Sequence, residues 1–337
     1  MKLKATVVVM VCAAAGLLGA QGTGPIEVLQ LRPNFYMIAG AGANIAAQVG
    51  SNGVVLVNAG TATASDAVLA AVAKISNQPI RYIINTSSDP DVVGGSANLA
   101  KAGKNITTPA IGALGRVSIL GSDLDIARVF AHENVLSRMR AAGPGGAESA
   151  PSELWPSETF AERRRTMYFN DEGIEIIHLP AAHTDGDTVV FFRKSDVIVA
   201  GNIIDTDRFP VIDLAKGGSL KGEIDALNRL IEMAIPPGPF IGLPNGPNAS
   251  ANLQGGTDVL PGHGRIYRQL DVVDYRDMVV IVSDIVQDMV KKNMTLDQVK
   301  AARPARAFET LYGATSGPWT TNDFVEAVYK SLTAGKS

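Results

Sequence analysis

The sequence predicts a four-layer αββα sandwich of the mixed α/β class, in which two β-sheets pack face to face and helices cover both outer surfaces. The first observation is a β-rich stretch with period-two patterning from Glu27 to Asn58, which glycines interrupt at hairpin spacing. The second is that each half of the chain runs from strands into an amphipathic helix. The third is size, because 337 residues with 46% hydrophobic content can bury one large core.

The first half supplies one sheet and its helices. The Glu27–Asn58 stretch predicts an antiparallel meander, and Ile80–Asn85 reads as a buried strand that leads into a loop at Thr86. Residues 143–157 are too rich in Gly, Pro and Ser to hold regular structure. Apolar residues at helical intervals predict helices over Asp66–Ile75, capped by Ser65, over Gly94–Lys104 and over Asp123–Ala142.

The second half repeats this order and predicts the other sheet. Its expected strands are Gly173–Leu179, Thr188–Arg193, Asp196–Ala200 and Asp258–Leu260. An amphipathic helix is expected over Leu220–Ile235, followed by a loop insertion over Pro236–Gly256 that is rich in Pro, Gly and Asn. Three helical segments are expected to close the chain.

The N-terminus has the pattern of a secretory signal peptide. Lys2 and Lys4 precede an uncharged run, residues 5–20, that is too short to span a bilayer comfortably. We expect cleavage near Ala20, so that residues 1–20 are the signal peptide and residues 21–337 form one domain. An uncleaved membrane anchor is the alternative, because Leu18 is bulkier than the residue usual at that place. The prediction is an exported protein, periplasmic or secreted, without membrane attachment after cleavage.

The net charge and the cysteine content limit the expected binding partners and the expected metal ligands. A formal net charge of -3, with no basic run beyond Arg163–Arg165, provides no field for phosphate backbones, so nucleic acid is not an expected partner. Cys12 is the only cysteine and lies in the predicted signal peptide. The mature chain would therefore have neither disulfides nor thiolate metal ligands. We expect a small-molecule substrate or ligand, and the sequence leaves the oligomeric state open.

Three loop segments are the candidate functional motifs. They are Thr86-Ser87-Ser88-Asp89-Pro90-Asp91-Val92-Val93-Gly94-Gly95, Ala182-His183-Thr184-Asp185-Gly186-Asp187 and Pro261-Gly262-His263-Gly264. The first resembles the loop Thr-His-x-His-x-Asp-His-x-Gly-Gly of the metallo-β-lactamase superfamily, with all three histidines replaced. The other two resemble the later metal-binding segments of that family. Further landmarks agree in order, and the resemblance spans roughly Ile26 to Leu332.

The resemblance implies where metal ions would be held. The first ion would lie at Ser87, Asp89 and His183, and the second at Asp91, Val92 and His263, with Asn202 in place of a bridging aspartate. Only Asp91, His183 and His263 keep the residue of the family. Ser87 and Val92 are therefore degraded ligand positions.

The replacements differ in severity. The Oδ of Asp89 lies as many bonds from Cα as the Nδ1 through which the family histidine binds, so this position keeps a donor. Asn202 keeps an oxygen but lacks the negative charge of a carboxylate, whereas Val92 has no donor atom. The candidate metal set is therefore Asp89, Asp91, His183, Asn202 and His263, and Asp91 is the candidate catalytic residue that would orient the nucleophile.

Two functions remain open at this point. Structural zinc sites are worth roughly 10–16 kcal/mol, or about 3–4 kcal/mol per ligand, so losing one imidazole from each half should weaken binding about a hundredfold or more. One divalent ion, Zn, Mn or Fe, would support hydrolysis of an ester, lactam or similar bond. Without a metal, the protein would be a pseudoenzyme with a binding or scaffold role. Whether it is an enzyme is therefore undecided by sequence.

The remaining polar residues of these segments have structural interpretations. Asp185 and Asp187 follow His183 in a tight turn, where we expect them to hydrogen-bond backbone amides and support the loop. His132 is expected in the middle of the Asp123–Ala142 helix in a packing role. His178 is expected at a strand end, also in a structural role.

Overall fold

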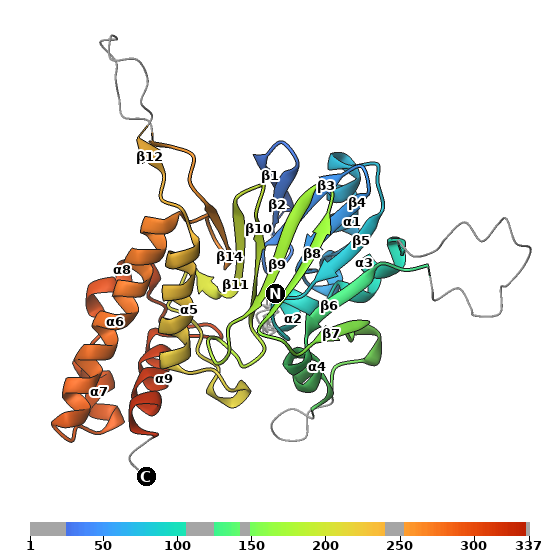
Figure 1. Ribbon diagram of the computed structural model, residues 1–337. Coiled ribbons are helices and arrows are strands. Elements are labelled where there is room, and N and C mark those ends of the chain that lie inside the picture. Colours follow the sequence, from blue (N-terminus) through green and yellow to red (C-terminus); the bar gives the residue numbers. More distant parts are fainter. Residues whose placement is uncertain (1–24, 106–124, 142–148, 240–252, 335–337) are drawn as a thin grey trace, which may run out of the picture.

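The computed structural model describes residues 25–105, 125–141, 149–239 and 253–334. Within these ranges, two β-sheets face each other and helices lie on their outer surfaces (Figure 1). The predicted signal peptide, residues 1–20, lies outside the described ranges. Of the helices in these ranges, none is both long enough and apolar enough to cross a membrane.

The first sheet has the order β1-β2-β3-β4-β5-β6-β7. Its strands are β1 (Glu27–Arg32), β2 (Phe35–Ala39), β3 (Ile45–Gly50), β4 (Gly53–Val57), β5 (Ile80–Ile84), β6 (Arg128–His132) and β7 (Glu158–Phe160). Strands β1 to β4 pair antiparallel, which confirms the predicted meander. Strands β4 to β7 pair parallel, so the carboxyl ends of β5 and β6 lie at the same edge.

The second sheet has the order β14-β11-β10-β9-β8. Its strands are β8 (Arg164–Phe169), β9 (Glu172–His178), β10 (Thr188–Phe192), β11 (Val197–Asp205) and β14 (Asp258–His263). Strand β14 pairs parallel with β11, and the other pairs are antiparallel. The strands expected in this half are confirmed, while β8 adds a strand that the sequence patterns did not predict. A small ribbon of β12 (Gly238–Pro239) and β13 (Leu253–Gln254) lies inside the expected 236–256 insertion.

Helices cover both sheets. The helices of the first half are α1 (Ser65–Ile75), α2 (Pro90–Val93), α3 (Ser96–Ala102) and α4 (Glu133–Arg140), and those of the second half are α5 (Leu220–Met233), α6 (Gln269–Lys291), α7 (Leu296–Ala302), α8 (Glu309–Tyr312) and α9 (Thr321–Thr333). Short 3-10 turns occur at η1 (Ala62–Ala64), η5 (Ser152–Leu154), η6 (Leu214–Lys216) and η7 (Arg306–Phe308). Helices α1 and α3 lie on the first sheet, whereas α5, α6 and α9 lie beside the second (Figure 1). The predicted αββα sandwich is confirmed.

One predicted helix is wrong in part. Residues 128–132 of the expected Asp123–Ala142 helix form the strand β6, and α4 begins only at Glu133. A short apolar run fits a buried strand as well as a helix, and pairing with β5 and β7 decides in favour of the strand. His132 is therefore the N-cap of α4, where its Nδ1 accepts from the Asn134 amide, and it does not lie inside a helix.

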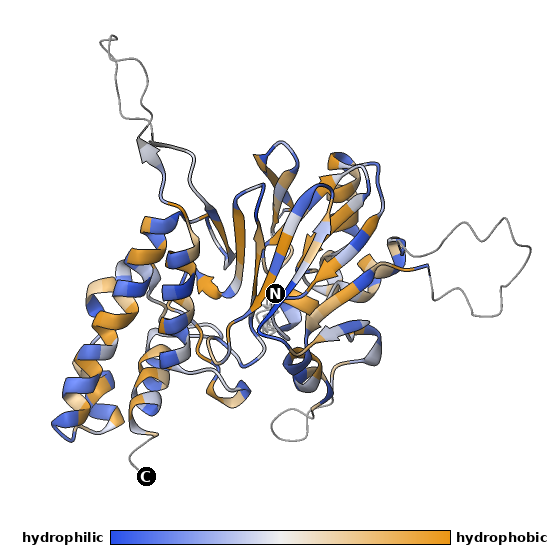
Figure 2. Cartoon of the chain, viewed as in Figure 1, coloured by the Kyte–Doolittle hydropathy of each residue, from blue (hydrophilic) through white to orange (hydrophobic). Residues whose placement is uncertain are grey.

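Three apolar layers hold the sandwich together. One lies between the sheets, where the rings of Phe35 and Phe192 meet edge to face at 4.8 Å. The second lies under α1 and α3, and the third lies under α5, α6 and α9. Figure 2 shows the corresponding apolar colouring along the strands and on one side of the long helices. Burial of these layers is what fixes the strand ends that carry the site.

Candidate functional site

The loops singled out by sequence meet at one edge of the sandwich. The Thr86 loop follows β5, His183 lies between β9 and β10, Asn202 lies in β11, and His263 ends β14. The amide nitrogen of Asn44, in the loop between β2 and β3, donates to the carbonyl of Gly262, which ties the two sheets together here at 2.7 Å. A Cβ at Gly262 would lie 2.2 Å from Asn202 Oδ1, so this close approach requires glycine.

The start of α2 presents Asp89 to the site. Asp89 is the N-cap residue and Pro90 occupies the first turn, a position that suits proline because no helical hydrogen bond is lost there. The Asp89 side chain makes no capping hydrogen bond. Its carboxylate is therefore directed to partners outside the helix.

The Asp89 carboxylate is the centre of a buried cluster. Its Oδ2 accepts hydrogen bonds from His183 Nε2 at 2.7 Å, Ser87 Oγ at 2.8 Å and Asn202 Nδ2 at 2.9 Å. Its Oδ1 accepts from Lys216 Nζ at 2.8 Å, and Lys216 also pairs with Asp213. The structure thus brings together the residues at which the resemblance placed the first metal, and it adds an ammonium group.

The charges of this cluster follow from its contacts. Burial by itself lowers the pKa of His183, but the Asp89 carboxylate outweighs it and raises that pKa to about 10. Nδ1 of His183 also lies 2.7 Å from the Val211 carbonyl, which can only accept, so both ring nitrogens donate. Burial alone would raise the pKa of Asp89, yet His183 and Lys216 lower it well below its usual value. The cluster is a carboxylate held between two cations.

Lys216 is the residue that sequence reasoning missed. It lies in η6, three residues after Asp213, and this spacing indicates an ion pair between neighbours. Burial by itself lowers the pKa of Lys216, but the carboxylates of Asp89 and Asp213 raise it by more. The net pKa is therefore above its usual value, and the group remains an ammonium. The contact with Asp89 joins residues 127 positions apart, and no local pattern could have revealed it.

A second pair lies beside the first cluster. His263 Nε2 and Asp91 Oδ2 are 2.8 Å apart, and the two side chains are 19% and 14% exposed. Burial lowers the pKa of His263, but the hydrogen bond to Asp91 and the nearby Asp205 carboxylate raise it above its ordinary value. Val92 points away into a buried apolar cluster with Val135 and contributes nothing to this pair.

Asn202 belongs to the Asp89 cluster, and its side chain also packs against Gly262, the residue before His263. Its Nδ2 donates to Asp89, while its Oδ1 is buried and accepts no hydrogen bond from the part of the chain that the structure describes. An unpartnered buried acceptor is unfavourable unless a donor or cation meets it. This oxygen is therefore the acceptor that the described residues of the site leave free, and it is shielded from solvent.

The turn after His183 is supported in two ways. Asp187 accepts from the backbone amide of Thr184 at 2.7 Å and from its hydroxyl at 2.8 Å, and burial raises the pKa of Asp187 to about 6. The Asp185 carboxylate instead receives the guanidinium of Arg138, at 3.0 and 2.7 Å. The Asp185 amide donates to the Lys216 carbonyl at 3.0 Å, so the same residue fixes the backbone that carries Lys216.

His132 and His178 lie outside these clusters and stack on each other. Their ring centroids are 3.6 Å apart and the planes differ by 14°. His178 Nε2 donates to the Asp185 carbonyl at 2.8 Å. Burial lowers the pKa of both rings. Repulsion between the two rings lowers the pKa of His132 further, and the Arg163 charge lowers that of His178.

The donor set around Asp89 does not fit a divalent ion. Among the described residues, no group of three or more His, Cys, Asp and Glu side chains is arranged to hold a metal. An ion at Asp89 would meet the Lys216 ammonium, and it would find a proton on the His183 nitrogen that should bind it. The second pair offers only the Asp91 carboxylate and the His263 imidazole, which is a sparse donor set.

The two-sheet sandwich, with the candidate site in loops at one edge, is typical of one class of protein. The chain belongs to the metallo-beta-lactamase superfamily, whose model matches residues 40–241. This is a family of hydrolases built on the same two-sheet sandwich. The resemblance inferred from the loop motifs is thereby confirmed.

Solved structures agree with this fold. The inverting sec-alkylsulfatase Pisa1 from Pseudomonas sp. is similar with a TM-score of 0.59 and 13% identity, over 90% of this chain and 50% of that one. The chain thus spans about half the length of the alkylsulfatase. A metallo-beta-lactamase from Pontibacter korlensis is similar with a TM-score of 0.51 and 17% identity, over 76% of this chain and 99% of that one. A search of curated protein sequences gave no match.

Proposed function

We propose that this protein is a metal-independent member of its superfamily, a pseudoenzyme that binds a small molecule at the loop edge of the sandwich. The contact of Lys216 Nζ with Asp89 Oδ1 at 2.8 Å supports this proposal most directly. The ammonium lies on the carboxylate that the family resemblance assigns to the first metal. The positive charge that a metal ion would supply comes from the chain itself.

The proton on His183 opposes a metal ion at Asp89. An ion at Asp89 would need the lone pair of His183 Nε2, and the pKa of His183 is about 10. Each pKa unit corresponds to about 1.4 kcal/mol, so removing this proton at neutral pH costs on the order of 4 kcal/mol. That is about what one ligand contributes to a structural zinc site, roughly 3–4 kcal/mol. His183 therefore adds little net affinity for a metal.

We also propose that the protein is exported from the cytoplasm. The pattern of residues 1–20 supports export to the periplasm or the exterior, with the domain released from the membrane after cleavage. The expected partner is a small molecule, because the net charge of -3 does not suit nucleic acid.

Asn202 favours a second candidate function, which is hydrolysis of an ester, lactam or similar bond with one divalent ion. Its buried Oδ1 has no hydrogen-bond partner among the described residues, and Asp91 and His263 lie in the neighbouring loops. An ion bound there would supply Lewis acidity for the hydrolysis. Asp91 would orient the nucleophile, as the sequence predicted.

Elemental analysis of protein purified without added metal separates the two functions. The metal-independent proposal expects well below one ion per chain, and a melting temperature that a chelator leaves unchanged. One ion per chain that is lost in His263→Ala, together with hydrolysis that a chelator abolishes, would contradict it and establish the second candidate.

A gain-of-metal variant provides the matched control. Ser87→His, Asp89→His and Val92→His restore the family donors, and Lys216→Ala removes the internal cation. If this variant folds, it should take up zinc while the parent does not. Uptake by the parent alone would contradict the idea that Lys216 and the lost imidazoles prevent binding.

A further inference from the structure

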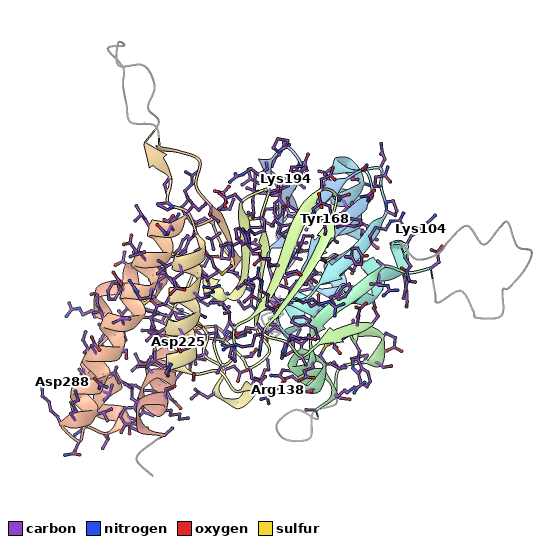
Figure 3. All side chains as sticks on the ribbon, in the orientation of Figure 1. Lys104, Arg138, Tyr168, Lys194, Asp225 and Asp288 are labelled. Carbon is purple, nitrogen blue, oxygen red and sulfur yellow. The ribbon has the colours of Figure 1, made fainter. Side chains whose placement is uncertain are left out.

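A cavity of about 580 Å³ lies between α5 and the β8–β9 strands, on the outer side of the second sheet. Among the described residues that line it there is none of the Asp89 or Asp91 clusters. Asp225, labelled on α5 in Figure 3, belongs to one wall, and Arg163 and Arg164 belong to the other. The cavity is therefore separate from the site described above.

The cavity has an apolar floor. Ile177, Leu179 and Ala226 line it and are buried. Its volume falls within the range of roughly 300–1,000 Å³ that small-molecule sites occupy. A ligand that fits it should carry an apolar body of modest size.

The rim carries positive charge that the protein does not neutralise. The acidic lining residues are already paired, Asp225 with Lys221 and Glu232 with Arg229. Arg163, in contrast, is exposed and has no side-chain hydrogen bond or ion pair in the described part of the chain.

The neighbouring strands add to this excess. Arg164 and Arg193 share the single carboxylate of Glu175, with Arg164 at 2.6 Å. Arg163 and His178 line the cavity together, the His178 amide donates to the Arg163 carbonyl at 2.9 Å, and the Arg163 charge opposes protonation of the His178 ring. The rim thus offers guanidinium groups, which bind planar and tetrahedral oxyanions through paired N–H donors.

We propose that this cavity binds a small organic anion, with the Arg163 guanidinium on its oxyanion head group and the Ile177, Leu179 and Ala226 floor under its apolar body. This site goes beyond the proposed function, because it shares no lining residue with the loop edge. The head group is a carboxylate, phosphonate, phosphate or sulfate, since a guanidinium recognises these by the same geometry.

Titration of the purified protein with phenylphosphonate, followed by calorimetry, tests the site. Phenylphosphonate should bind, and Arg163→Gln should weaken binding at least about tenfold, as expected for loss of a charge-assisted hydrogen bond. Arg306→Gln is the matched control, because Arg306 is also exposed but lies in η7 and does not line the cavity. It should leave the affinity unchanged. Circular dichroism checks that both variants are folded.

Two further ligands make the result decisive. Neutral benzamide should not bind, and inorganic phosphate should bind more weakly than phenylphosphonate because it has no apolar body. Equal affinities in the two arginine variants, or no binding by the parent protein, would overturn the site. Inorganic phosphate binding as tightly as phenylphosphonate would overturn the assignment of the floor. None of these outcomes depends on metal content, so they are independent of the proposed function.

Discussion

His183 and His263 differ from His132 and His178 in what faces each imidazole ring. The first two meet carboxylates, Asp89 at 2.7 Å and Asp91 at 2.8 Å. The other two meet each other at a ring distance of 3.6 Å. Burial lowers the pKa in all of these sites, but only the carboxylates reverse its effect.

This contrast shows why residue type is a poor guide to a metal site. A histidine is a ligand only when a ring nitrogen keeps its lone pair. In the Asp89 cluster the replaced neighbours turn His183 into an imidazolium, whereas His132 and His178 have lowered pKa values and stack on each other. The four histidines of the chain therefore form two groups, one with raised and one with lowered pKa values, and the motifs alone do not reveal this difference.

Asp89→Ala should have the largest effect, because it leaves the buried His183 without its hydrogen-bonded carboxylate and leaves Lys216 with Asp213 alone. Breaking one partner of a buried ion pair costs about 3–5 kcal/mol, and we expect a loss of that size in the free energy of unfolding measured with urea. Asp225→Ala removes an exposed carboxylate paired with Lys221 and should cost less than about 1 kcal/mol. Similar losses in the two variants would contradict the buried cluster.

The pH dependence of stability is the second prediction. The pKa of His183 is about 10 in the folded state and near 6.5 when unfolded, so its contribution is fully present below pH 6.5 and is lost as pH rises through 10. The lowered pKa values of His132 and His178 act in the opposite sense, because their contribution is present above pH 6.5 and is lost as pH falls through the folded-state values. We expect stability to be greatest near pH 6.5 and to decline on each side, with the alkaline decline spread between pH 6.5 and 10.

NMR titration of the imidazole protons separates the alkaline decline, which we assign to His183, from the acid decline, which we assign to His132 and His178. The ring protons of His183 should not shift between pH 6 and 8, whereas those of His178 should shift only below pH 6.5. A midpoint near 6.5 for His183 would show that Asp89 does not hold its proton.

The sequence was sufficient for the fold because the information is local and repeated. Period-two strands, glycine-punctuated hairpins and an amphipathic α5 all predicted the sandwich, and burial in the structure agrees. The error at residues 128–132 arose where a short apolar run fits both strand and helix. Only the parallel pairing of β6 with β5 and β7 decides it, and these pairings join residues far apart in the chain.

The site was predicted less completely. The loop motifs identified Asp89, Asp91, His183 and His263, and the structure places them at one edge of the sandwich in two adjacent pairs. Their charges could not be read, because they depend on Lys216, whose contact with Asp89 is non-local. The spacing of the motifs predicts which donor residues are present. It does not predict that a lysine from another segment forms an ion pair with one of them.

Lys216→Met tests the internal cation directly and should have an intermediate effect. The Lys216 side chain is 36% exposed, so the loss should lie between the values for exposed and buried pairs, at about 1–2 kcal/mol. Asp89 keeps His183 as its partner in this variant. Lys292→Met, which removes an exposed pair with Asp288, is the control and should cost less than about 0.5 kcal/mol. A loss no greater than that of the control would mean that Lys216 contributes nothing to the cluster.

His178→Phe should have the smallest effect and sharpens the comparison from the other side. Phenylalanine can keep the stack on His132 but cannot donate to the Asp185 carbonyl. Asn134 Nδ2 still donates to that carbonyl at 2.9 Å, so the oxygen is not left unpaired. We therefore expect a loss of about 0.5–1 kcal/mol in urea unfolding at pH 7, at the low end for a hydrogen bond.

The decline of stability below pH 6.5 should also shrink, because one of the two neutral rings that oppose protonation is gone, while the decline toward pH 10 should remain. An unchanged acid limb would mean that the stacked pair does not set the acid response, and a loss above about 2 kcal/mol would mean that the His178 hydrogen bond supports the Asp185 turn far more than its remaining partners do.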